Sequence, residues 1–189
     1  MFFLEKYNNK KNIRFKSFEF ALIEAKKRKH KILVETGVAR GKIKFFLFHK
    51  INWKDGMSTM ILSDYARHEM GELNSCDINQ KNVNFAKKFT KSNIDFINFF
   101  VDDSLNFLEN FEKKIDFLYL DSLDGQFKEA SSHQLKEIQI AKKHLKLGSL
   151  VLLDDKESKT NLSIDYMLKN DFFLINETNE QVLFSYKTP

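Results

Sequence analysis

Short apolar segments alternate with amphipathic helical segments from residue 31 to the end of the chain. Continuous apolar runs at 32–34, 117–120 and 150–153 are typical of strands buried on both faces of a sheet. Because helical patterns separate the first five strands, the order predicts βαβ units and a parallel sheet. We therefore predict an α/β fold, a doubly wound and mostly parallel sheet with helices on both sides.

The pattern predicts seven strands. They cover 31–36, 72–78, 93–101, 115–120, 150–153, 172–176 and 181–186. Predicted helices cover 17–29, 58–70, 80–90, 104–111, 128–145 and 158–168, and residues 38–57 are expected to be a long loop with a helical turn at 43–48. No helix separates the last two strands, so we expect them to form an antiparallel hairpin at one edge.

The length limits the chain to one domain. We expect 1–189 to be a single unit, in which 1–30 is an N-terminal helical segment and 31–189 is the Rossmann-like core. The single cysteine, Cys76, excludes an internal disulfide and is typical of a reducing compartment. No apolar run approaches the roughly 18–20 residues of a membrane span, and no signal-peptide pattern is found. The chain is therefore expected to be cytoplasmic, without membrane contact.

A carboxylate follows each of the five predicted parallel strands: Glu35, Asp77, Asp102-Asp103, Asp121 and Asp154-Asp155. Ligands of open parallel sheets bind beyond the carboxyl ends of the strands, so we place the candidate site there. Asp77 follows the second strand, where a carboxylate can bind both hydroxyls of a ribose. The alternative is that Asp77 caps the next helix, a role that Asn79 could also fill.

The glycine pattern excludes two nucleotide-binding motifs. Gly37 and Gly41 are four residues apart, so the sequence has no G-x-G-x-x-G fingerprint, and it has no P-loop G-K-[ST]. Both absences argue against NAD and against a P-loop nucleotide.

Several motifs, in this order, resemble the class I S-adenosylmethionine (SAM)-dependent methyltransferases over about residues 31–155. Within that class the sequence is similar to a bacterial branch with E-T-G and D-G-x-S-T motifs, and to metal-dependent small-molecule and sugar O-methyltransferases. It departs from the family by about fifteen residues inserted between Gly41 and Gly56. The motifs are Glu35-Thr36-Gly37, Trp53-Lys54-Asp55-Gly56-Met57-Ser58-Thr59, Ser75-Cys76-Asp77-Ile78, Asp103-Ser104, Asp121-Ser122, His133 to Glu137, and Asp154-Asp155.

The resemblance implies SAM as the cofactor and a set of residues that bind it. The methionine part would lie beside the first strand and the start of the next helix, the ribose at the second strand, and the adenine at the third. Asp121 would face the sulfonium or the substrate. The implied residues are Glu35, Thr36, Gly37, Gly56, Ser58, Thr59, Asp77, Ile78, Asp103, Ser104 and Asp121.

Asp121, Asp154 and Asp155 resemble the acid trio of the metal-dependent members. Mg²⁺ prefers such oxygen ligands, and a bound ion would lower the pKa of a substrate hydroxyl. The alternative is that Asp154-Asp155 begin a loop and cap the next helix.

Three residues are candidate catalytic groups. Asp121 faces the substrate in the resemblance, and Asp124 stands three residues beyond it. His133 could act as a general base, oriented by Glu137 one helical turn away, or could be a surface histidine.

These features predict a SAM-dependent methyltransferase that methylates a hydroxyl of a small molecule or sugar, with Mg²⁺ as a candidate assistant. The alternatives are an RNA or DNA methyltransferase and a non-catalytic SAM-binding scaffold. Only 4 of the 31 basic residues are Arg, which disfavours nucleic acid.

The net charge of +5 divides unevenly. Residues 1–60 carry 15 basic and 5 acidic residues, whereas 61–189 carry 16 and 21, so the first third favours an anionic small-molecule acceptor. Within the inserted segment, Phe45, Phe46, Phe48 and Trp53 could form a lid, a small satellite core or a homodimer contact.

Overall fold

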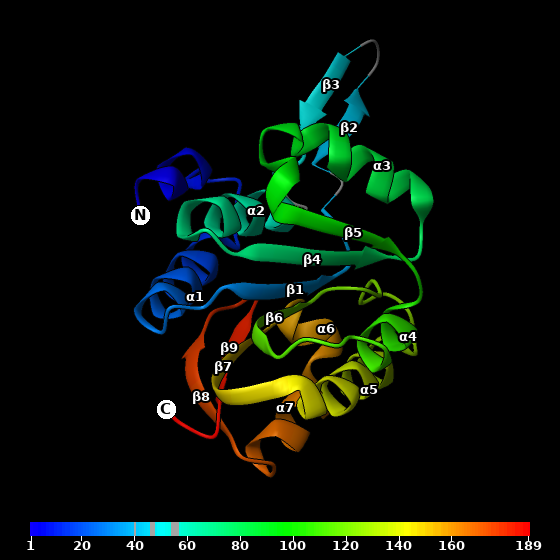
Figure 1. Ribbon diagram of the computed structural model, residues 1–189. Coiled ribbons are helices and arrows are strands. Elements are labelled where there is room, and N and C mark those ends of the chain that lie inside the picture. Colours follow the sequence, from blue (N-terminus) through cyan, green and yellow to red (C-terminus); the bar gives the residue numbers. More distant parts are fainter. Residues whose placement is uncertain (40, 46–47, 54–56) are drawn as a thin grey trace.

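A twisted seven-stranded sheet runs through the molecule, with helices on both of its faces (Figure 1). This computed structural model describes residues 1–39, 41–45, 48–53 and 57–189, with the backbone alone described over 42–45 and 48–50. The strand order is β5-β4-β1-β6-β7-β9-β8. The strands are β1 (Ile32–Thr36), β4 (Glu72–Asp77), β5 (Ile97–Val101), β6 (Ile115–Leu120), β7 (Leu145–Leu153), β8 (Phe172–Glu177) and β9 (Val182–Tyr186).

The first five strands in this order are parallel, and β9 is antiparallel to both β7 and β8. The predicted α/β fold with an antiparallel C-terminal hairpin is therefore confirmed. The hairpin lies at the sheet edge with β9 inside and β8 outermost.

Seven α-helices are described, together with three short 3₁₀ helices. The 3₁₀ helices are Phe2–Tyr7, Lys91–Phe96 and Lys142–His144. The α-helices are α1 (Phe15–Lys27), α2 (Ser58–Glu69), α3 (Gln80–Phe89), α4 (Ser104–Glu109), α5 (Ala130–Ala141), α6 (Lys156–Lys159) and α7 (Asn161–Leu168). None of these helices combines the length and apolar character that crossing a bilayer requires.

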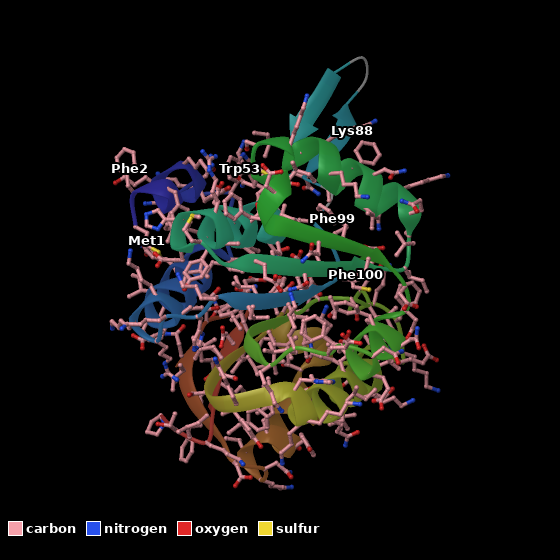
Figure 2. All side chains as sticks on the ribbon, in the orientation of Figure 1. Met1, Phe2, Trp53, Lys88, Phe99 and Phe100 are labelled. Carbon is pink, nitrogen blue, oxygen red and sulfur yellow. The ribbon has the colours of Figure 1, made fainter. Side chains whose placement is uncertain are left out.

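The sheet separates two apolar cores because successive side chains of a strand point to opposite faces. On β6, Phe117 and Tyr119 pack with α1 and α2, whereas Leu118 and Leu120 pack with α4, α5 and α7. Figure 2 shows the same alternation on β5, where the first core takes Phe99 and the opposite face takes Phe100, which stacks on Phe107 of α4.

The inserted segment differs from its prediction. It contains an antiparallel ribbon of β2 (Lys42–Phe45) and β3 (Phe48–Ile51), which projects from the body of the molecule in Figure 1. The helical turn predicted at 43–48 is therefore wrong. Apolar and polar residues alternate in β2, and that period of two favours a strand over a helix.

Trp53 follows the ribbon and packs against the core that includes residues of α1 and α2, so this side chain joins that core rather than a separate satellite core (Figure 2). The side chains of Phe45, Phe46 and Phe48 lie outside the described residues, as does Gly56.

Three boundaries also differ by several residues from their predictions. β7 begins at Leu145 rather than residue 150, and the preceding helix ends at Ala141 rather than 145. Leu145 and Leu147 fit a helical period as well as a strand period, so the pattern could not separate the two. β5 begins at Ile97 rather than residue 93, after the 3₁₀ turn.

Candidate functional site

Two adjoining cavities open beyond the carboxyl ends of β1, β4 and β6, where the strand order reverses around β1. The larger has a volume of about 440 Å³ and the smaller about 260 Å³. We call them the larger cavity and the smaller cavity, and together the cleft. Both are lined by Gly37, Asp77, Ile78, Ser122 and Leu123.

Gly37 stands at the junction of the two cavities, directly after β1. Its φ of +84° lies in the left-handed region that favours glycine, and its N–H donates to the Cys76 carbonyl at 2.8 Å. A Cβ on this residue would lie 2.1 Å from the carbonyl oxygen of Asp121. Only glycine lets β1 approach the end of β6 this closely.

Asp77 ends β4 and lies on the wall of both cavities. Its carboxylate accepts from the backbone N–H groups of Asn79 (2.7 Å) and Val38 (3.3 Å) and from the Asn82 side-chain amide (3.2 Å). The cap of α3 is Asn79, whose side chain accepts from Lys81 N–H. The alternative role for Asp77 as the helix cap is therefore wrong. Ile78 beside it is 73% exposed, an apolar surface offered to the cleft.

Asp103, Ser104 and His133 line the smaller cavity. Asp103 caps α4 by accepting from the N–H groups of Leu105 and Asn106, while Ser104 Oγ lies 2.9 Å from His133 Nε2. The predicted contact of His133 with Glu137 is present at 3.8 Å. However, His133 is absent from the lining of the larger cavity, where Asp121 and Asp124 lie. Its role as a general base, for which Asp124 is the rival candidate, stays a prediction.

Glu35, Thr36, Ser58 and Thr59 are buried and line neither cavity. Glu35 accepts hydrogen bonds from Thr59 (2.9 Å) and Ser75 (2.5 Å), and Thr59 accepts from Ala39 N–H (2.8 Å). Burial raises the pKa of Glu35 to about 7, although its hydroxyl donors lower it. These residues thus hold the loop after β1 against α2 and β4, and their role as direct cofactor contacts stays a prediction.

Asp121, Asp154 and Asp155 come together at the ends of β6 and β7, with one oxygen from each within 4.8 Å of the others. We call them the acid trio. All three line the larger cavity, as the sequence placed them.

Two buried cations lie against the acid trio. Lys159 Nζ is 2.7 Å from Asp121 Oδ1 and 3.3 Å from Asp155 Oδ2, whereas Arg14 reaches Asp154 Oδ1 through Nε (2.7 Å) and Asp155 Oδ1 through Nη2 (2.6 Å). Burial lowers the pKa of Lys159, but the acids raise it by more, so the ammonium stays protonated. Burial and Asp154 raise the pKa of Asp121, and Lys159 opposes them.

The acid trio therefore does not fit a divalent cation as the described residues stand. Both oxygens of Asp155, and one oxygen each of Asp121 and Asp154, already contact a positive group. An ion bound by the same oxygens would lie against the Lys159 ammonium, and like charges at that distance repel strongly in a buried site.

The outer part of the larger cavity holds Asp124, which is exposed, and Phe127, which is 49% exposed. Phe127, Arg14 and Lys159 were not predicted as site residues. Lys159 follows Asp155 by four residues, a spacing that brings helical side chains together, so a sequence signal existed. Arg14 carries no such signal, because 140 positions separate it from Asp154.

Comparisons with known proteins agree with this geometry. A sequence profile described as a methyltransferase domain matches residues 53–156. No curated protein matches the sequence significantly.

Three solved structures illustrate the similarity of fold. A cofactor-bound protein from MTB is 14% identical, with a TM-score of 0.66, and the alignment covers 92% of this chain and 81% of that one. A SAM-dependent O-methyltransferase from Thermotoga maritima is 13% identical, with a TM-score of 0.63 and coverage of 92% and 66%. An rRNA methylase from Streptococcus thermophilus is 12% identical, with a TM-score of 0.60 and coverage of 90% and 96%.

At these identities the solved structures establish the fold, while the profile covers more than half of the chain. The chain therefore belongs to the methyltransferase-domain family and has the fold of the class I SAM-dependent methyltransferases.

Proposed function

We propose that this protein transfers a methyl group from SAM to a hydroxyl of a small molecule, such as a sugar. The observation that carries the proposal is the joined cleft. A donor site built around Asp77 adjoins, through Gly37, a larger cavity that presents the carboxylates of Asp121 and Asp124.

The donor half fits SAM in its shape and in its donor set. Gly37 and Asp77 line both cavities, and Ile78 and Leu123 offer apolar surface to a base. Asp77 keeps its negative charge available for a ribose diol, because within the described part of the chain its hydrogen-bond donors are all neutral. Bound SAM supplies a methyl group on a positively charged sulfur.

The acceptor half positions a hydroxyl and receives its proton. In the transfer, an O–CH₃ bond forms while the S–CH₃ bond breaks, and the bonding pair stays on sulfur. The hydroxyl proton passes to a carboxylate on the cavity wall, and we assign this role to Asp121, which lines the larger cavity and whose backbone carbonyl adjoins Gly37. Positioning of the two reactants supplies most of the remaining rate enhancement.

The charge of the acceptor half bears on the class of acceptor. Among the described residues, five carboxylates line the larger cavity (Asp77, Asp121, Asp124, Asp154, Asp155), against Arg14 on its wall and Lys159 paired with Asp121, a formal net charge of −3. This negative charge favours a neutral acceptor and disfavours a polyanion such as RNA. The anionic acceptor predicted from the basic residues of 1–60 stays an alternative, and several side chains of 38–57 within that segment lie outside the described residues.

Calorimetric titration with S-adenosylhomocysteine tests the donor half. We expect wild-type protein to bind it and Asp77→Asn to bind about 10–100-fold more weakly, because hydrogen bonds from a charged group contribute about 1.5–3 kcal/mol each. Asp95→Asn, an exposed acid outside the cleft, is the matched control and should bind normally. Absence of binding by the wild type would contradict the proposal.

Radiolabelled methyl transfer to a panel of sugars, phenols and amines tests the acceptor half. Asp121→Asn should lower kcat while the affinity for S-adenosylhomocysteine changes little. Methylation of RNA in preference to every small molecule would replace the proposed acceptor class.

A further inference from the structure

We propose that Arg14 and Lys159 take the place of a divalent cation in the acid trio, so that methyl transfer by this protein requires no metal ion. The inference rests on the proposed function, because the trio forms the wall of the acceptor half. It concerns how the carboxylates there are neutralised and what positive group faces the acceptor.

Lys159 is built into the trio rather than placed near it. The side chain is 2% exposed, and its ammonium is surrounded by Asp121 Oδ1 at 2.7 Å, the Leu123 carbonyl at 3.2 Å and Asp155 Oδ2 at 3.3 Å. An ammonium has three N–H donors, so three oxygens satisfy it completely. A buried lysine with a full set of oxygen partners does not leave the site without a large loss of interactions.

Arg14 bridges the other two acids. It lies at the start of α1, is 11% exposed, and uses two nitrogens of one guanidinium to contact Asp154 at 2.7 Å and Asp155 at 2.6 Å. The rigid planar fork of arginine suits such paired contacts. Gln181 donates to the same Asp154 oxygen at 2.7 Å, which fixes that carboxylate further.

The two cations carry the same charge as one Mg²⁺ ion. Three carboxylates with Arg14 and Lys159 have a net charge of −1, which is also what they would have with one divalent ion alone. A metal added to the present arrangement would therefore raise the local charge to +1 and would stand next to an ammonium. Arg14 and Lys159 therefore already cancel as much of the charge of the acid trio as one divalent ion would.

Only one of the two cations faces the acceptor. Among the described residues, Arg14 lines the larger cavity, whereas Lys159 contacts Asp121 from the protein interior and borders a small pocket with Gln134 and Glu137. Arg14 is therefore the group that would face an acceptor oxygen and stabilise negative charge developing on it. Lys159 is a positioning residue that fixes Asp121 and Asp155.

Metal binding measured without turnover tests this assignment. We expect wild-type protein to show no Mg²⁺ heat in calorimetry and no Mn²⁺ binding by electron paramagnetic resonance at millimolar ion. Lys159→Met should gain Mn²⁺ binding, because it leaves the carboxylates in place and removes the ammonium. Lys156→Met is the matched control, since this neighbouring lysine pairs with Glu177 away from the trio, and it should gain nothing.

Two results overturn the proposal. One is stoichiometric Mg²⁺ binding by wild type that Asp155→Asn abolishes. The other is failure of both Lys159→Met and Arg14→Met to bind Mn²⁺, which would mean that geometry rather than the cations excludes the ion. If Lys159→Met does not fold, Arg14→Met and the wild-type titration still decide between the outcomes.

S-adenosylhomocysteine binding in the presence of EDTA separates this inference from the proposed function. Binding unchanged by EDTA, with methyl transfer also unchanged, supports both. Loss of S-adenosylhomocysteine binding under all conditions contradicts the donor site itself. Intact binding with transfer restored only by Mg²⁺ overturns the metal-free assignment alone.

Discussion

The two ends of the cleft use carboxylates in opposite ways. At the donor end, Asp77 receives hydrogen bonds from two backbone N–H groups and the amide of Asn82. At the acceptor end, Asp154 and Asp155 contact the guanidinium of Arg14. Neutral donors orient a carboxylate and leave its charge for a ligand, whereas cations orient it and cancel that charge. Position at a strand end therefore does not decide what a carboxylate does; its partners do.

The two ends also differ in where their partners come from. Asn79 and Asn82 lie within five residues of Asp77, so the donor end is largely local. Arg14 and Asp154 are 140 positions apart in the sequence. The donor end depends on one strand–helix turn, and the acceptor end depends on the docking of α1 against the sheet.

The largest expected effect lies where the two ends meet. Gly37→Ala should lower the free energy of unfolding by about 4 kcal/mol or more and abolish S-adenosylhomocysteine binding, because its Cβ would clash with the Asp121 backbone at a positive φ. Urea denaturation measures the first effect and calorimetry the second.

Gly148→Ala is the matched control for that change. Its φ of +81° is similar, but its Cβ would meet nothing nearer than 3.7 Å, so a loss of only about 1 kcal/mol is expected. Equal losses in the two variants would show that backbone strain, and not the close approach of β1 to β6, makes glycine necessary at Gly37.

The next largest effect belongs to the acceptor end. Arg14→Met should cost about 3 kcal/mol of stability, because it leaves the buried Asp154 without its cation. Asp154→Asn in the same background should recover part of the loss, since the uncompensated charge is then gone. Arg67→Met, at a more exposed arginine, should change stability by less than about 0.5 kcal/mol. A double variant as unstable as the sum of the two singles would argue against a coupled pair.

A smaller effect should appear only as a function of pH. With a pKa of about 7 in the fold and about 4.5 when unfolded, Glu35 keeps its proton in the native state over a range where the unfolded chain has lost it. The native state then binds more protons, so the contribution of Glu35 is complete below pH 4.5 and is lost as the pH rises toward 7.

Glu35→Gln removes this dependence. Relative to the variant, the wild type should lose about 2 kcal/mol of stability between pH 4 and pH 6.5, measured by urea denaturation at each pH. Glu112→Gln, at an exposed glutamate, should follow the wild-type curve. Parallel curves for wild type and Glu35→Gln would show that the carboxylate titrates normally.

The smallest effect is expected at the far side of the donor end. His133→Ala should weaken S-adenosylhomocysteine binding about 2–10-fold, the value of one hydrogen bond near the ligand, because it removes the partner of Ser104. The kcat at saturating SAM should stay close to wild type. A large fall in kcat with unchanged affinity would instead return His133 to a catalytic role.

Much of the fold was predictable because three of the parallel strands carry continuous apolar runs and helical patterns separate the strands. The α/β order and the C-terminal hairpin followed from the period of the apolar residues. The ribbon at 42–51 differs from the helical turn predicted at 43–48 because the sequence alternates only over 42–45, whereas residues 45–48 are all apolar and His49-Lys50 are both polar. The end of the helix before β7 was missed because Leu145 and Leu147 suit both periods.

The candidate site was predictable where it depends on strand ends and not where it depends on packing. Gly37, Asp77 and the acid trio follow from their position after a strand. Glu35 and Thr59 are buried behind the residues that line the two cavities. No sequence motif distinguishes a buried residue of this kind from a lining one. Arg14 could not be placed at all, since its contact with the trio exists only after the first helix has packed on the sheet.

The long sequence separation between Arg14 and Asp154 also bears on which parts of the chain can fold first. Bringing residues 14 and 154 together closes a loop of 140 positions, whereas Asn79 and Asn82 lie two and five positions from Asp77. Long-range closure is slow and loses more chain entropy, so local structure around β4 and α3 can form first. Cofactor-binding ability should therefore return before methyl-transfer activity when the unfolded chain is allowed to refold.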